Sequence, residues 1–156
     1  TVWAVHTQYP GATEYDNYDF NSFAQVGSIY LGAKSDGIYE LGGSDDAGTD
    51  IAAVIRTGLF DFGSAQLKQV TRAYLGYTSS NRLVLKTIAT DGGQKVERWY
   101  ELKDKTADEV RESRIKLGKG VKSRYWQFEL INVDGGSFEI DQLHLMPLML
   151  SRRVKE

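Results

Sequence analysis

The most regular feature of this sequence is an alternation of apolar and polar side chains. Within residues 69–78 the alternate positions on one face hold Ala73, Leu75 and Tyr77, and within residues 82–90 they hold Leu83, Leu85, Thr87 and Ala89. Side chains of a β-strand point alternately to the two faces of a sheet, so this period of two predicts strands that each bury one face. Residues 79–81, Ser-Ser-Asn, are predicted to join the two strands as a hairpin turn.

Two further turns carry the tripeptide Asp-Gly-Gly, at residues 91–93 and 134–136. Glycine adopts the positive φ angles that tight hairpins need, and Asp-Gly is a preferred pair at such turns. We therefore predict two β-hairpins, the first joining residues 82–90 to 94–102 and the second joining residues 123–133 to 137–146.

The last predicted strand changes the parity of its apolar positions. Phe138 and Ile140 share one face, whereas Leu143 and Leu145 fall on the other parity. One extra residue inserted in a strand restores a common face, so we predict a β-bulge near residues 141–142.

Many short strands between glycine-rich turns predict an all-β protein, an antiparallel β-sandwich of the jelly-roll type. We assign the sandwich to residues 51–156. Residues 1–50 are predicted to form an irregular hairpin or extended segment, packed on or continuous with an upstream domain. Local patterns predict strands at residues 2–7, 28–33 and 36–43, and a single helical turn at residues 106–113, where Thr106 and Glu109 fit a capping box.

Composition and charge narrow the functional classes. The chain has 156 residues, 41% of them hydrophobic and 26% charged, which is typical of a folded globular domain. It has no cysteine, which excludes disulfides and thiolate chemistry. Its longest apolar run, residues 145–150, is too short for a span of roughly 20 residues, so we expect no membrane insertion.

Charge is distributed unevenly along the chain. The net charge is −2, which favours neither nucleic acid nor a membrane surface as a partner. Residues 1–50 hold eight acidic residues and one lysine, a net charge of −7, so residues 51–156 carry a net charge of +5. This polarity either steers self-assembly and partner docking or is an ordinary solvated surface.

Catalytic signatures are missing from the sequence. His6 and His144 are the only histidines, and no G-x-S-x-G motif is present. We interpret His144 as a packed or edge residue of a strand. Glu129, Glu139 and Asp141 are candidates for a glycosidase acid pair, but alternation alone places about half of strand residues in solvent, and we interpret them as solvated acids. We predict no catalytic residue and no enzymatic activity.

Two charged segments are candidates for binding sites. Asp45, Asp46 and Asp50 crowd a glycine turn, yet the spacing does not match a calcium loop, and a polar turn is preferred over a cation site. We expect no metal and no cofactor. Residues 111–124 hold six basic residues around an apparent hairpin turn at 117–121. We interpret this segment as a basic hairpin tip, docked on an acidic neighbour or solvated.

Exposed aromatic rings are the usual basis of sugar binding by β-sandwiches. The candidates are Trp3, Trp99, Tyr100, Tyr125 and Trp126. Trp126 shares a face with Phe128 and Leu130, which predicts a core position. Neighbouring residues of a strand point to opposite faces, so one of Trp99 and Tyr100 is expected outside. We therefore name Trp99 and Tyr100 as candidate ligand-binding residues.

A set of short segments runs through most of the chain, from Asn17 to Val154. It comprises residues 17–23 (NYDFNSF), 36–41, 46–48, 55–63, Lys68, 114–120, 123–130, 138–143 and 150–154. Together they resemble a recurring pattern of strand and turn residues in virion proteins of tailed bacteriophages, often encoded in prophages. The pattern contains no catalytic signature.

The resemblance implies the carboxy-terminal part of a larger tail or baseplate component. It implies a virion tail location after assembly in the host cytoplasm, with other virion proteins and further copies of the chain as partners. Our first hypothesis is therefore a non-enzymatic module for tail assembly or host attachment. The alternative is a carbohydrate-binding β-sandwich that contacts a cell-surface glycan. A glycan hydrolase is a third, disfavoured hypothesis, because no acid pair is evident.

Overall fold

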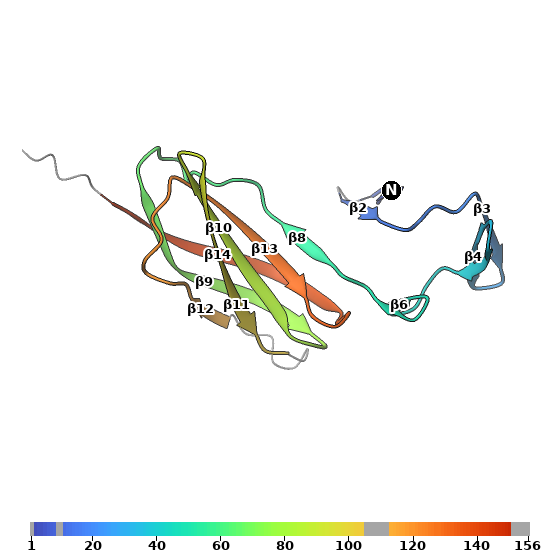
Figure 1. The fold of residues 1–156 in the computed structure, drawn as a ribbon. Helices are drawn as coiled ribbons and strands as arrows, with labels where there is room; N and C mark the ends of the chain where they lie inside the picture. The colour runs from blue at the N-terminus through green and yellow to red at the C-terminus, as the bar shows by residue number, and fades with distance from the viewer. Residues whose placement is uncertain (1, 9–10, 105–112, 151–156) are drawn as a thin grey trace, which may run out of the picture. The chain divides into compact units, whose positions relative to one another are not determined.

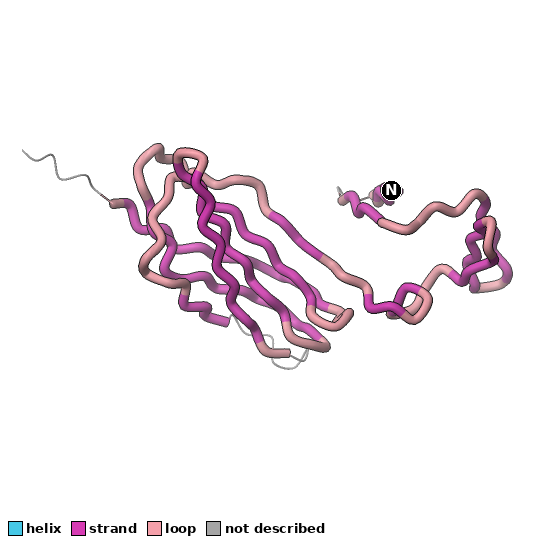
Figure 2. The backbone as a smooth tube through the Cα atoms, viewed as in Figure 1, coloured by secondary structure: helices cyan, strands magenta, loops and turns pink. Residues whose placement is uncertain are grey.

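The computed structural model describes residues 2–8, 11–104 and 113–150. Over these residues the chain forms 14 β-strands and no helix, and all strand pairs are antiparallel (Figures 1 and 2). The all-β class predicted from the sequence is thus confirmed. The chain divides into two compact units, Thr1–Gly43 and Ser44–Glu156, which are described separately below.

The N-terminal unit contains two small sheets. One pairs β1 (Val2–Val5) with β2 (Ala12–Tyr15), and the other has the order β3 (Ser22–Val26), β4 (Ile29–Lys34), β5 (Gly37–Glu40). Strands β1, β4 and β5 lie where the local patterns predicted them.

The second unit contains two larger sheets. The four-stranded sheet has the order β11 (Gln94–Leu102), β10 (Leu83–Asp91), β13 (Tyr125–Asn132), β8 (Val54–Arg56). The three-stranded sheet has the order β12 (Ser113–Lys116), β9 (Lys68–Ser79), β14 (Phe138–Met149). A short hairpin of β6 (Asp45–Asp46) and β7 (Thr49–Asp50) precedes them.

The two larger sheets share one hydrophobic core, which makes the arrangement sandwich-like. Alternate residues of each sheet contribute to it, among them Leu75 of β9, Leu85 of β10 and Phe128 of β13. Trp126 is only 2% exposed, and its ring stacks on Phe128 with centroids 6.4 Å apart. The predicted core position of Trp126 is confirmed, whereas the jelly-roll topology stays a prediction.

The first Asp-Gly-Gly turn forms the predicted hairpin. Asp91 pairs with Gln94, and the two residues between them, Gly92 and Gly93, have φ angles of 56° and 79°. Two successive left-handed residues define the turn type whose twist matches flanking β-strands, and glycine adopts it without steric cost.

Three other predicted hairpins are wrong, although the turns themselves exist. The segments 79–81, 117–121 and 134–136 each connect a strand of one sheet to a strand of the other. Ser80 lies in the first of these segments, and Ser137 directly follows the last. The Ser80 N–H donates to the Ser137 carbonyl, and the Ser137 N–H donates to the Ser80 hydroxyl, both at 2.9 Å. Alternation defines the buried face of a strand but not the sheet to which it belongs.

The predicted bulge in the last strand is confirmed. The pairing of β14 with β9 shifts its register between Ile140 and Gln142, so Asp141 is the extra residue. Ile140, Leu143 and Leu145 therefore all pack against the core despite their different parity. The predicted helical turn at 106–113 lies outside the described residues, apart from Ser113, which begins β12.

Candidate functional site

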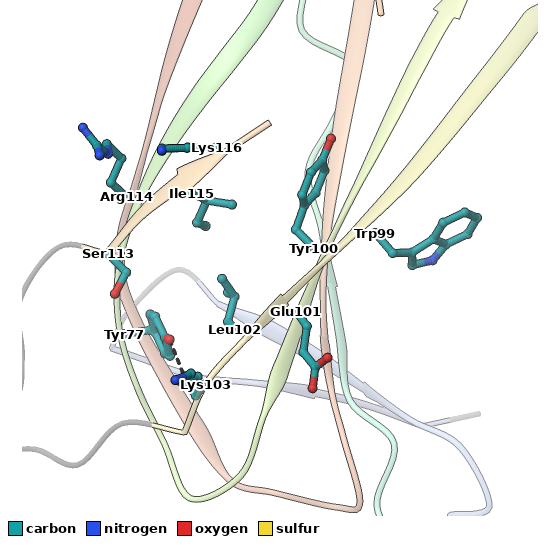
Figure 3. A pocket seen from close by; sticks show the side chains of 10 residues that line it. All are labelled: Tyr77, Trp99, Tyr100, Glu101, Leu102, Lys103, Ser113, Arg114, Ile115 and Lys116. Carbon is teal, nitrogen blue, oxygen red and sulfur yellow. Dashed lines mark hydrogen bonds between the residues drawn. The ribbon is translucent and has the colours of Figure 1, made fainter. Parts of the chain in front are cut away.

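A groove of about 570 Å³ lies between β11 and β12. These strands are the edges of the two sheets on one side of the second unit, so the groove is the place where the two sheets stay open. Figure 3 shows its lining side chains, which are Tyr77, Trp99, Tyr100, Glu101, Leu102, Lys103, Ser113, Arg114, Ile115 and Lys116.

Both predicted ligand-binding residues line this groove, but on opposite faces of β11. Trp99 is 59% exposed, and its ring points away from Tyr100 (Figure 3). Tyr100 packs against the core, and its hydroxyl accepts a hydrogen bond from the Gly118 N–H at 2.9 Å. Trp99 therefore offers an accessible ring face, whereas Tyr100 braces the turn that follows β12.

Tyr77 closes the groove at the level of the core. Its hydroxyl donates to the Lys103 carbonyl at 2.8 Å, which ties β9 to the end of β11 (Figure 3). Burial raises the pKa of the Tyr77 hydroxyl above its ordinary value, and this outweighs the opposing effect of its hydrogen bond with Ser113. The hydroxyl thus stays protonated and remains a donor at neutral pH.

The rim of the groove is positively charged. Lys103, Arg114 and Lys116 line it, and no carboxylate of the described chain lies within 4 Å of their charged nitrogens. The one acidic residue in the lining, Glu101, is neutralised by an ion pair with Arg82. The groove therefore suits a partner that brings carboxylates and apolar or aromatic groups together.

An ion-pair network covers the outer face of the four-stranded sheet. Glu129 is 5% exposed, and its carboxylate lies 2.6 Å from Arg56 Nε and 3.6 Å from Lys86 Nζ. Lys86 also pairs with Glu97 at 3.0 Å and lies over the Trp99 ring, 5.5 Å from its centroid. The interpretation of Glu129 as a solvated acid is wrong. The neighbouring strands β8 and β10 place the side chains of Arg56 and Lys86 beside its carboxylate, which is buried.

The other candidate acids and the histidines are dispersed. Glu139 and Asp141 are exposed on β14, which belongs to the other sheet from Glu129, so the three acids do not share one face. His144 lies on the edge strand β14, with Nε2 2.9 Å from Gln142 Oε1. His6 Nδ1 accepts a hydrogen bond from the Gln8 N–H.

The aspartate-rich turn is the β6–β7 hairpin. Asp45 pairs with Asp50 across it, and a carboxylate oxygen of Asp45 accepts the Gly48 N–H at 2.7 Å. Asp45 thus stabilises the turn through a side-chain hydrogen bond to the backbone, a common role of aspartate in turns. In the part of the chain that the structure describes, no three His, Cys, Asp or Glu residues form a group suited to a metal ion.

The basic segment 111–124 divides between several environments. Arg114 and Lys116 line the groove, Arg124 pairs with Asp91 at 3.2 Å, and Lys119 and Lys122 are exposed. Its first base, Arg111, lies outside the described residues.

An aromatic cluster holds the three-stranded sheet of the N-terminal unit, which the sequence pattern did not reveal. Tyr18 and Phe20 contact edge to face with centroids 4.8 Å apart, and Phe20 also contacts Phe23 and Tyr39. The Phe20 ring covers Gly32 so closely that an added Cβ would lie 2.7 Å from it. The only sequence signal was the aromatic density of residues 15–23.

Lys34 fastens the loop before β3 to this sheet. Its ammonium group lies 2.6 Å from the Asp19 carboxylate and 2.8 Å from the Asn17 carbonyl, and 4.9 Å from the centroid of the Phe20 ring. The hydrogen bond between them lowers the pKa of Asp19 and raises that of Lys34.

Despite this cluster, the N-terminal unit leaves most of its large apolar side chains in solvent. Among its described residues only Gly32 is buried. Eight large hydrophobic residues are exposed: Trp3, Val5, Tyr15, Phe23, Val26, Ile29, Tyr30 and Ile38. A unit of this size with no buried side chain lacks the core that normally stabilises a domain.

The residues described by the structure contain no helix long and apolar enough to cross a membrane. Comparisons of the chain with protein-family models, curated proteins and solved structures found no match.

Proposed function

We propose that this chain is a non-enzymatic component of a bacteriophage virion, a tail or baseplate module for assembly or host attachment. It would be built into the virion tail in the host cytoplasm, next to other virion proteins and further copies of itself. The observation that carries this proposal is the exposure of the eight large apolar side chains of the N-terminal unit.

Apolar surface exposed to this extent favours association with another protein that covers it. Removing apolar surface from water stabilises by about 25 cal/mol per Å². Large apolar patches on a soluble protein commonly mark interaction sites. The N-terminal unit has no core of its own to hide these side chains, so a neighbouring protein is the natural cover. The resemblance to tailed-phage virion proteins assigns that neighbour to a virion.

The test is the protein content of purified phage particles. Particles induced from a bacterium that carries this coding sequence would be banded by density and analysed by mass spectrometry. We expect peptides of this chain at a fixed ratio to the other tail proteins. If the chain is expressed in the cells but absent from the banded particles, the proposal is wrong.

Carbohydrate binding is a second candidate function, favoured by Trp99. Its ring is 59% exposed beside the groove, and Lys86 over one ring face holds it in position. Flat aromatic rings stack on the apolar faces of sugars. This function is compatible with the first, because a module for host attachment contacts the cell surface, where glycans are exposed.

On this second hypothesis, Trp99→Ala is expected to weaken binding to a cell-surface polysaccharide at least about tenfold, as the loss of one stacking contact. Affinity electrophoresis of the full chain in gels containing host polysaccharide would measure the effect. Trp3→Ala is the matched control, since it removes another exposed tryptophan that does not line the groove. Equal retardation of wild type and the Trp99 variant would contradict sugar binding at this site.

A further inference from the structure

We infer that the groove between β11 and β12 is the docking site for the N-terminal unit of a second copy of this chain. Copies would then join head to tail, the N-terminal unit of each seated on the second unit of the next. This inference rests on the proposed assembly function and names the partner surfaces that would carry it.

Charge complementarity is the first argument. The N-terminal unit carries five acidic residues and one lysine, and Lys34 pairs with Asp19. The four remaining acids have no ion pair within the described chain: Glu14, Asp16, Asp36 and Glu40. Three cations line the groove and likewise have no ion pair within the described chain: Lys103, Arg114 and Lys116. When two copies meet, the acidic surface of one attracts the basic surface of the other, and the unpaired charges of both gain partners.

Apolar matching is the second argument. The groove opens between the sheets, where Tyr100, Leu102 and Ile115 lie behind its charged rim. The N-terminal unit exposes apolar side chains on short extended strands, among them Trp3 and Val5 of β1. Extended segments of this kind insert alternate side chains into a pocket while their backbone follows a sheet edge.

The strand edges provide the third argument. In the described chain β11 pairs only with β10, and β12 pairs only with β9, so each keeps one row of backbone groups free of strand partners. Such edges are templates for an added strand, and native proteins usually cover or disfavour them. The β1–β2 hairpin has its own free edges and is therefore a suitable addition.

The symmetry of the resulting assembly follows from the two surfaces. The donor unit and the acceptor groove are different patches of the chain. Copies therefore join either reciprocally, as a closed pair that exchanges N-terminal units, or successively, as a larger ring or a filament.

The experiment is a complementation test with full-length variants in sedimentation velocity. Arg114→Glu with Lys116→Glu reverses the groove charge, and Glu14→Lys with Asp16→Lys reverses the donor charge. Like charges in an interface cost several kcal/mol, so each double variant is expected to self-associate on the order of 100-fold more weakly than wild type. A mixture of the two variants pairs the intact donor with the intact groove and the charge-reversed donor with the charge-reversed groove. Opposite charges then meet at both contacts, so the mixture is expected to recover association like that of wild type.

The matched control is Lys119→Glu with Lys122→Glu, which reverses two exposed charges outside the groove lining and should leave association unchanged. Equal melting temperatures would show that the variants fold. The inference is wrong if wild type is monomeric, if the groove variant assembles like wild type, or if the mixture associates no better than either variant alone. The virion role is judged separately, because a chain found in particles but monomeric alone would refute the docking mode and not the assembly function.

Discussion

Replacing Trp126 with alanine is expected to lower the free energy of unfolding by about 3–5 kcal/mol, the usual cost of truncating a large core aromatic. Trp126 is 2% exposed, stacks on Phe128 and lies in the core shared by the two sheets. Removal of its ring leaves a cavity that rigid neighbouring strands fill only in part. Urea unfolding followed by far-ultraviolet circular dichroism would measure the change.

Two substitutions control this prediction. Trp99→Ala removes the same side chain from an exposed site and should cost about 0.5 kcal/mol or less. Trp126→Phe should cost less than Trp126→Ala, because it keeps a ring in the core and removes an indole N–H that has no hydrogen-bond acceptor among the described residues. Loss of ligand binding by Trp126→Ala at an unchanged melting temperature would contradict the core assignment.

Replacing Glu129 with alanine is expected to cost about 2 kcal/mol. Removing one partner of a fully buried ion pair costs roughly 3–5 kcal/mol, and we lower this value because the Arg56 side chain is largely exposed and therefore screened by water. The variant leaves Lys86, which is mostly buried, with only Glu97 as a counter-charge among the residues that the structure describes. Chemical unfolding of both proteins at neutral pH would measure the difference.

Glu139→Ala is the matched control, since Glu139 is an exposed acid on β14 without an ion pair among the described residues. Its effect should stay within about 0.5 kcal/mol. A double-mutant cycle with Arg56→Ala would isolate the energy of the Arg56–Glu129 pair. If the Glu129 and Glu139 variants lose the same small amount of stability, the network on the outer sheet face contributes nothing.

The local features of this fold were predictable from the order of the amino acids. Alternation of apolar and polar side chains predicted the strands β9, β10 and β13, because the side chains of a pleated strand point alternately to its two faces. The parity change after Ile140 predicted the bulge at Asp141, and Gly92 and Gly93 predicted a hairpin through their positive φ angles. The core position of Trp126 followed from the same alternation. Each of these features depends on residues that are neighbours in the chain.

Features that join distant segments were not predictable in this way, because they depend on how whole sheets pack. The turns at 79–81 and 134–136 connect strands of different sheets, although their sequences resemble hairpin turns. Turn residues set the local backbone angles but do not determine which sheet the next strand joins. Glu129 became a buried ion-pair partner only because β8 and β10 bring Arg56 and Lys86 beside it. Similarly, Trp99 was a candidate from sequence, but two of the three cations in its groove, Arg114 and Lys116, come from the other sheet. Strand pairing across long separations, governed by the packing of whole sheets, has no signature in a local pattern.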